Sequence, residues 1–307
     1  MCSMAITMAP KPESLAPKHW LMDQARGIVV SRPAGIMGIL NATPDSFSDG
    51  GQHHQSATAI HAGVAMVAAG ALWLDVGGES SRPGALPVSL ELELQRVIPV
   101  IAGLRAAGVT VPISIDTTKA RVAAAAMDAG ASAINDISAG SDPDLFAVAA
   151  RHACPLILMH MRGTPQNMQN DPSYTDVVAS VIAYLRERLL AAERAGVDPQ
   201  SMLVDPGIGF GKTVEHNLAL LRALPQIESE LDRPIVLGLS RKSFIAKIIG
   251  SIKQTGIQLL AAERDTASHV LHGMLAGSCA LLRVHDVPGA VAAVRLHHAL
   301  QGGAHEL

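Results

Sequence analysis

Short apolar segments alternate with longer helical segments along most of the chain, and this alternation is what most limits the possible folds. Eight segments have the nearly continuous apolar character of strands that are covered on both faces. They are residues 36–40, 72–76, 111–115, 133–137, 156–160, 202–204, 235–239 and 280–284. Stretches that favour helices lie between them over residues 57–69, 92–107, 119–129, 177–195, 216–231 and 261–276. We therefore expect parallel strands joined by right-handed helical crossovers.

Eight strand–helix units in roughly 250 residues fit a closed barrel better than an open doubly wound sheet. The open sheet remains the alternative fold. The predicted fold class is α/β, with a single (β/α)8 TIM barrel. No linker, charge run or low-complexity segment interrupts residues 35–295, so we expect one catalytic barrel over residues 19–301. Residues 1–18 are expected to form a flexible tail, and residues 20–30 to cap the base of the barrel.

Charge and cysteine usage exclude several classes of protein. The net charge is −3 and the pI is near 6.5, so no positive field is available to hold nucleic acid or an anionic membrane surface. Cys2, Cys154 and Cys279 are far apart and odd in number, which argues against a disulfide framework and a thiolate zinc site. The apolar run over residues 59–76 is divided by Gly70, so we expect no membrane span. The resulting expectation is a cytoplasmic protein.

Polar residues follow nearly every predicted strand, at the end where a (β/α)8 barrel carries its chemistry. Helix capping accounts for any single Asp, Asn or Ser at such a position. It does not account for Arg283 and His285, which alternate around Val284 and therefore share one face. Because an arginine inside a barrel needs an anion, we expect Arg283 to face an anionic substrate. The full set is Asn41, Asp75, Glu79, Ser81, Arg82, Asp116, Asn135, Asp136, His160, Arg162, Asp205, Ser240, Arg241, Lys242, Arg283, His285 and Asp286.

The signs of these charges differ between the early and the late strands. The last two strands commonly supply the phosphate site of this fold, and here they predict a phosphorylated or pyrophosphorylated substrate. Their polar residues are Ser240, Arg241, Lys242, Arg283 and His285. The earlier residues suit a heterocycle rich in N–H donors, such as an aminopyrimidine edge, because ionised carboxylates only accept hydrogen bonds. These residues are Asp116, Asn135 and Asp205. Asn41 is a candidate oxygen ligand for a Mg²⁺ that bridges phosphate oxygens.

Over residues 35–295, the chain resembles dihydropteroate synthases in a series of motifs that occur in the same order. The most specific are N-A-T-P-D-S-F-S-D-G-G at 41–51, D-V-G-G-E-S-S-R-P-G at 75–84 and R-V-H-D-V at 283–287. The others are I-D-T at 115–117, N-D-I-S at 135–138, M-H-M-R-G-T-P-Q-N-M-Q at 159–169, D-P-G-I-G-F-G-K at 205–212 and L-S-R-K-S at 239–243. Ser81 departs from the family's usual threonine, and residues 249–266 diverge most.

The resemblance implies a transferase that forms a C–N bond. In this reaction p-aminobenzoate displaces pyrophosphate from (7,8-dihydropterin-6-yl)methyl diphosphate, and dihydropteroate is formed for folate biosynthesis. The resemblance also implies a Mg²⁺ cofactor, a homodimer and a target of sulfonamides. The catalytic residues that it implies are Asp45, Arg82, Asp116, Lys242, Arg283 and His285.

Matching positions also imply binding roles. By position, the residues that resemble the family's pterin-binding residues are Asp116, Asn135, Asp205 and Lys242. The resemblance also implies that Arg283 lies along the pterin. Pyrophosphate is assigned to Arg283 and His285, and the metal contact to Asn41. The surroundings of p-aminobenzoate are Ser81, Arg82, Phe210 and Ser240, with Asp45 and Phe47 on a mobile first loop. Lys212 lies outside these sets, so Lys212→Ala is expected to change activity little.

Two other functions are compatible with parts of this pattern. A methyltetrahydrofolate:corrinoid methyltransferase has a related pterin-binding barrel but needs no pyrophosphate site, and the bases after the last two strands argue against it. A non-catalytic pterin-binding paralogue would keep the pterin carboxylates and lose loop or pyrophosphate residues, whereas every implied residue is present here.

Overall fold

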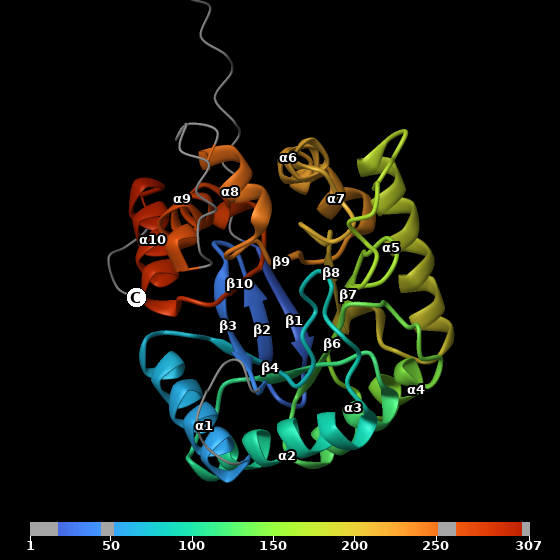
Figure 1. The fold of residues 1–307 in the computed structure, drawn as a ribbon, viewed down its shortest axis with the longest axis vertical. Helices are drawn as coiled ribbons and strands as arrows, with labels where there is room; N and C mark the ends of the chain where they lie inside the picture. The colour runs from blue at the N-terminus through green and yellow to red at the C-terminus, as the bar shows by residue number, and fades with distance from the viewer. Residues whose placement is uncertain (1–17, 44–51, 251–261, 303–307) are drawn as a thin grey trace, which may run out of the picture.

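Eight parallel strands form a nearly closed barrel inside a ring of helices (Figure 1). The computed structural model describes residues 18–43, 52–250 and 262–302. The barrel strands are β3 (Gly35–Asn41), β4 (Trp73–Gly77), β5 (Ile113–Asp116), β6 (Ala133–Asp136), β7 (Leu156–Met159), β8 (Met202–Asp205), β9 (Val236–Leu237) and β10 (Leu281–Val284). Their order is β8-β7-β6-β5-β4-β3-β10-β9, and a parallel bridge between Val204 and Ile235 joins the two outer strands. The predicted barrel is confirmed, with every strand within two residues of its expected bounds, and the open-sheet alternative is wrong.

The register of the strands brings their polar ends to one level. Asn41 pairs with Gly77, Gly77 with Asp116, and Asp116 with Asn135. Because parallel strands point the same way, these carboxyl-terminal residues form a row at one mouth of the barrel. Asp75 lies two residues earlier on its strand, and so one side-chain layer deeper.

Helices occupy the six predicted segments, one of which needs correction, and three further helices, over residues 144–152, 243–250 and 287–300, were not among the predicted segments. The helices are α1 (Gln52–Ala68), α2 (Leu90–Ala106), α3 (Ala120–Asp128), α4 (Asp144–His152), α5 (Val177–Arg194), α6 (Val214–Arg222), α7 (Leu224–Leu231), α8 (Ser243–Gly250), α9 (Asp265–Leu275) and α10 (Val287–Leu300), with 3-10 turns η2 (Pro199–Ser201), η3 (Ala262–Arg264) and η4 (Ala276–Ser278). The single helix predicted over residues 216–231 is two helices, because Pro225 lies in the first turn of α7 and cannot donate a helical hydrogen bond. None of the described helices is long and apolar enough to cross a membrane.

An antiparallel hairpin closes the other end of the barrel, as residues 20–30 were predicted to do. It consists of β1 (His19–Asp23) and β2 (Ile28–Ser31). Met22, Ile28 and Val30 of the hairpin form one buried cluster with side chains near the starts of the barrel strands. The barrel residues of this cluster are Met37, Trp73, Ala133, Ile157, Leu203, Val236, Ala280 and Leu281.

Trp73 is the bulkiest buried side chain in the cluster between the hairpin and the barrel strands, and it is only 1 % exposed. Its truncation therefore tests how the hairpin packs on the barrel. Trp73→Ala is expected to lower the free energy of unfolding by about 3–5 kcal/mol, because it leaves a cavity between the hairpin and the strands. Leu86→Ala is the control: Leu86 is 81 % exposed, and its truncation is expected to cost less than about 0.5 kcal/mol. Guanidinium denaturation followed by circular dichroism measures both, and an unchanged midpoint for Trp73→Ala would contradict the packing.

Candidate active site

Arg283 joins three strands across the mouth of the barrel. Its Nε donates to Asp75 Oδ2 on β4 and its Nη2 donates to Asp116 Oδ2 on β5, both at 2.5 Å. Burial opposes the charge of the guanidinium, but Asp75 and Asp116 hold the pKa of Arg283 above its usual value. Burial also raises the pKa of Asp116 to about 7, although the charge of Arg283 opposes that shift. The protein therefore supplies counter-ions for Arg283, so its burial does not by itself require an anionic substrate.

Asp75 is the centre of this network, although the sequence analysis included it only among the polar strand-end residues and assigned it no contact. The carboxylate is fully buried. Besides Arg283, it accepts hydrogen bonds from Ser114 Oγ at 2.5 Å and from Asn135 Nδ2 at 3.1 Å. One acid thus orients both Arg283 and Asn135. The signal that was available is its position within an otherwise apolar strand, where a buried charge must have partners.

Asp205 and Lys242 come to the same mouth from β8 and from the turn after β9. Asp205 Oδ1 accepts the amide of Gly207 at 2.7 Å, and burial raises the pKa of this carboxyl group. The ammonium of Lys242 lies 3.8 Å from the centroid of the Phe210 ring. Burial and then the charge of Arg283 lower the pKa of Lys242 to about 8. Burial therefore makes the charged form of Lys242 less favourable than that of an exposed lysine.

The glycines after Asp205 are required by close backbone packing against the end of β7. Gly207 has φ +70°, and a Cβ atom there would lie 1.8 Å from the carbonyl oxygen of His160. Gly211 has φ +62°, and its Cβ would lie 2.7 Å from the carbonyl oxygen of Arg162. Only glycine combines this left-handed backbone with such an approach. The loop thereby places Phe210 at the barrel mouth.

Lys212 lies under this loop and holds it by hydrogen bonds. The expectation that Lys212→Ala changes activity little assumed that Lys212 has no role in the site. The lysine is 4 % exposed. Its Nζ donates to the carbonyl of Phe210 at 2.9 Å and lies 2.9 Å from Nδ1 of His160. Burial lowers the pKa of Lys212 to about 7. Truncation would leave the Phe210 carbonyl without this donor, so we now expect Lys212→Ala to lower activity.

Ser240 and His285 form a second contact, between the turn after β9 and the end of β10. The amide of His285 donates to Ser240 Oγ at 3.3 Å, and Nδ1 of His285 lies 3.2 Å from the same oxygen. Arg241, which the sequence placed in the same anion-binding cluster, instead pairs with Asp265 through two hydrogen bonds of 2.7 Å. The predicted cluster of bases is therefore only partly available to a ligand.

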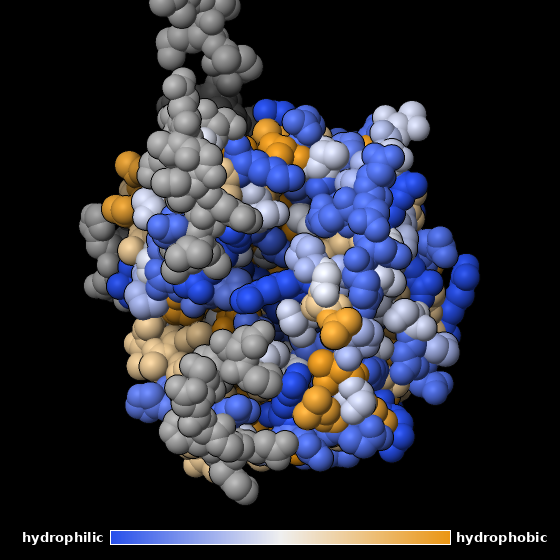
Figure 2. All heavy atoms as spheres, viewed as in Figure 1, coloured by the Kyte–Doolittle hydropathy of each residue, from blue (hydrophilic) through white to orange (hydrophobic). Residues whose placement is uncertain are grey.

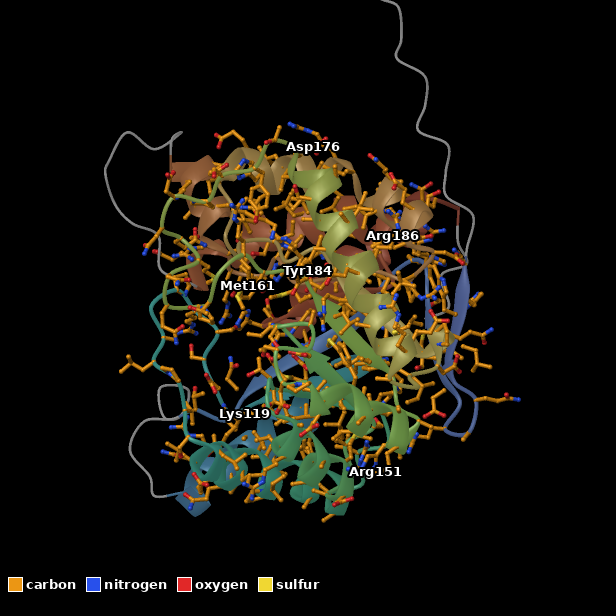
Figure 3. The ribbon with its side chains drawn as sticks, turned by 90° about the vertical axis from the view of Figure 1, so that its right-hand side faces the viewer. Lys119, Arg151, Met161, Asp176, Tyr184 and Arg186 are labelled. Atoms are coloured by element: carbon orange, nitrogen blue, oxygen red, sulfur yellow. The ribbon has the colours of Figure 1, made fainter. Side chains whose placement is uncertain are left out.

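A cavity of about 280 Å³ lies beside Asp116, and Glu79 and Ser81 are the other predicted site residues that line it. Ser81 lines this cavity together with Met161 and Tyr184, which lie close to each other in Figure 3. In Figure 2, hydrophilic residues gather around a hollow at the centre of the face shown. Asn41 is half-buried at the end of β3, and Arg82 is exposed in the loop after β4. Asp45 and Phe47 lie outside the described residues.

This combination of a parallel barrel, buried acids and strand-end bases defines a class of protein. Residues 37–285 match the profile of the family described as pterin binding enzyme. The chain is therefore a member of the pterin-binding barrels.

Its relatives within that class are named consistently. The dihydropteroate synthase of Synechocystis is 46 % identical over 259 residues, which cover 82 % of this chain and 85 % of the relative. The dihydropteroate synthase of Xanthomonas albilineans, solved with 4-aminobenzoic acid, is 42 % identical, with a TM-score of 0.83 over 93 % of this chain and 100 % of that one. The same enzyme in complex with 7,8-dihydropteroate is 41 % identical, with a TM-score of 0.77 over 88 % and 95 % of the two chains. The chain belongs to the dihydropteroate synthase family, so the resemblance of the motifs is confirmed.

Buried histidines make the stability of the fold depend on pH. Burial lowers the pKa values of His160 and His285 to about 3 and that of His272 to about 4. The unfolded chain therefore binds protons first as the pH falls below about 6.5, and the folded state loses stability from there downward. No hydrogen bond offsets the burial of His272, because neither of its ring nitrogens has a hydrogen-bond partner within the described residues.

His272→Leu tests this linkage. The variant removes one buried protonation site and no hydrogen bond, so it is expected to reduce the stability lost between pH 7.5 and pH 5 by about 1–2 kcal/mol. His61→Leu, on the exposed side of α1, is the control for introducing a leucine. Thermal unfolding at the two pH values is the measurement. The same pH-dependent loss in His272→Leu and wild type would contradict the assignment.

Proposed function

We propose that the chain joins p-aminobenzoate to (7,8-dihydropterin-6-yl)methyl diphosphate and releases pyrophosphate, which gives dihydropteroate for folate biosynthesis. One observation carries this proposal. Three side chains at the ends of three different strands each have an oxygen atom with no hydrogen-bond partner within the described residues: Asp116 Oδ1, Asn135 Oδ1 and Asp205 Oδ2. An aminopyrimidine edge has the N–H donors that such acceptors require. A substrate and the product of this reaction are the molecules bound in the two Xanthomonas albilineans structures.

The proposed pterin site uses these acceptors together with Lys242 and Arg283. Its walls are partly apolar, because Phe210 packs with Ile137, Met159 and Met168 in one small buried cluster. Phe210 is proposed to border p-aminobenzoate, with the ammonium of Lys242 over one face of its ring. Ser81, Arg82 and Ser240 complete the surroundings of that substrate and supply the hydroxyl and cationic groups that bind a carboxylate.

The proposed chemistry needs no protein nucleophile. The amine nitrogen of p-aminobenzoate attacks the methylene carbon, and the bond from that carbon to the pyrophosphate oxygen breaks. The proton that the amine loses passes to the departing pyrophosphate or to water. The dihydropterin stabilises positive charge at the methylene as the anion departs. Nη1 of Arg283 and Nε2 of His285 have no hydrogen-bond partners within the described residues. Nη1 can donate to the pyrophosphate, and so can Nε2 in the tautomer in which Nδ1 accepts from Ser240 Oγ. Electrostatic stabilisation of the leaving group is then the main contribution of the protein.

The proposed Mg²⁺ fits the donor at the end of β3. The Asn41 side chain is half-buried and has no hydrogen-bond partner in the described part of the chain. That part also contains no group of three or more His, Cys, Asp or Glu residues that could hold a metal. One amide oxygen therefore fits an ion that takes its other ligands from phosphate oxygens and water. When bound, the ion supplies charge that stabilises the departing pyrophosphate.

We also propose a homodimer in the cytoplasm. The large side chains Val270 and Met274 on α9 and Leu296 and Leu300 on α10 are 59–86 % exposed, and the two helices pack against each other. A second copy of the chain would remove this apolar surface from water. Cys154 and Cys279 are free thiols, which suit a reducing compartment.

Arg283→Ala and Asn41→Ala test the proposed leaving-group contacts. Each is expected to lower kcat/KM by about 10²–10³, the typical effect of losing one preorganised electrostatic contact. Glu230→Gln is the control, because Glu230 forms an exposed ion pair with Arg186, outside the proposed site. Steady-state release of pyrophosphate is the readout. Near-normal activity of Arg283→Ala would reject the assignment.

The deciding experiment is incubation of the protein with both substrates while pyrophosphate is measured. Release that depends on p-aminobenzoate, and that stops when EDTA removes the metal, supports the proposal. No release at any magnesium concentration would reject the synthase activity.

A further inference from the structure

Arg241 lies in the tight turn between the proposed substrate residues Ser240 and Lys242. The amide of Lys242 donates to the carbonyl of Leu239 at 3.2 Å, which makes Arg241 the third residue of a four-residue turn. Its φ is +60°, in the left-handed region where glycine is usual at this turn position. A residue with a side chain keeps such a conformation only when its surroundings hold it there.

The start of α9 and the residue before it hold the amide, the carbonyl and two guanidinium nitrogens of Arg241. Asp265 accepts hydrogen bonds from Nε and Nη2 of the guanidinium, each at 2.7 Å. The buried Ser268 accepts the amide of Arg241 through its Oγ at 3.1 Å. Arg264 donates from Nη1 to the carbonyl of Arg241 at 2.7 Å. These three residues belong to the R-D-T-A-S segment at 264–268, where the motifs of the family left no assigned role.

The same face of α9 reaches the end of β10. His269, four residues after Asp265 and so on the same side of the helix, places its Nε2 3.1 Å from Asp286 Oδ2. Asp286 directly follows His285. One helix face therefore fixes two segments of the proposed site: the turn that carries the substrate residues Ser240 and Lys242, and the end of β10, which carries the pyrophosphate contact His285.

The conformation of Arg241 decides how its two neighbours are directed. On one side Ser240 Oγ contacts His285, and on the other the ammonium of Lys242 sits on the ring of Phe210. A different φ at Arg241 would rotate these two residues relative to each other. The guanidinium of Arg241 meanwhile forms an ion pair with Asp265.

We infer that Arg241, held by Arg264, Asp265 and Ser268, is not a ligand of the pyrophosphate. It is a positioning residue for Ser240 and Lys242 and, through the contact of Ser240 with His285, for the pyrophosphate site. The inference rests on the proposed function, because it concerns the leaving group of that reaction. It assigns α9 a role in the site, although the helix contributes no proposed substrate contact.

Arg241→Gly and Arg241→Ala separate the two roles. Both variants remove the guanidinium, but glycine adopts the left-handed turn without strain and alanine does not. If Arg241 positions the turn, the glycine variant is expected to keep kcat/KM about tenfold above the alanine variant. Equal losses in the two variants would mean that the guanidinium itself matters, and would overturn the inference.

Asp265→Asn provides a second test through product inhibition by inorganic pyrophosphate. The substitution neutralises the partner of Arg241, so the two roles predict opposite results. A positioning role predicts an inhibition constant about tenfold higher, because the turn loosens. A direct ligand would be freed, and unchanged or tighter inhibition would overturn the inference. Ser268→Ala, which removes only the acceptor of the Arg241 amide, is expected to act in the same direction as Asp265→Asn and replaces it if that variant does not fold.

Two controls keep these outcomes distinct from a failure of the proposed function. Wild-type pyrophosphate release is measured first, and its absence rejects the function on which the inference rests. An active wild type with equally impaired glycine and alanine variants rejects only the positioning role. Glu230→Gln, in the exposed ion pair between α5 and α7, is expected to leave both the activity and the inhibition constant within about twofold of wild type.

Discussion

A buried guanidinium between two carboxylates organises the mouth of this barrel. Arg283 of β10 binds Asp75 of β4 and Asp116 of β5, and Asp75 also accepts hydrogen bonds from Ser114 and from Asn135 of β6. Removing one partner of a buried ion pair leaves an uncompensated charge, which typically costs about 3–5 kcal/mol. These side chains therefore hold one another in place before any substrate arrives. Oxygens of Asp116 and Asn135 that the network does not use remain as acceptors at the mouth, where the pterin is proposed to bind.

The loops around this network are fixed by side chains from neighbouring segments. Three successive carbonyls, at residues 209, 210 and 211, accept hydrogen bonds from Gln169, Lys212 and Tyr174. The turn at Arg241 is held in the same way by the start of α9. Such support matters because proposed contacts such as Phe210, Ser240 and Lys242 lie on loops, which are less rigid than strands. The site thus depends on residues that have no proposed contact with a substrate.

Some of these features were predictable from the sequence and others were not. The strands and their polar ends were predicted because both signals are local: a run of apolar residues, followed by polar ones. The break between α6 and α7 was also local, since Pro225 marks it, but the apolar pattern was continuous across it. The roles of Asp75 and Lys212 were missed, because a buried charge acquires its role from whichever groups the fold places beside it. The same reason explains why Arg241 was grouped with the anion-binding bases.

The sequence alone determined the barrel, the family and the set of residues gathered at the strand ends, because periodicity, glycine turns and motif order are written along the chain. The tertiary structure decided which of these charges the protein neutralises itself. The partners of Arg283 are 208 and 167 residues away in the sequence, and Asp265 is 24 residues from Arg241. The physical reason is that the strength of an ion pair depends on distance and burial in space. Neither quantity can be read from the order of residues.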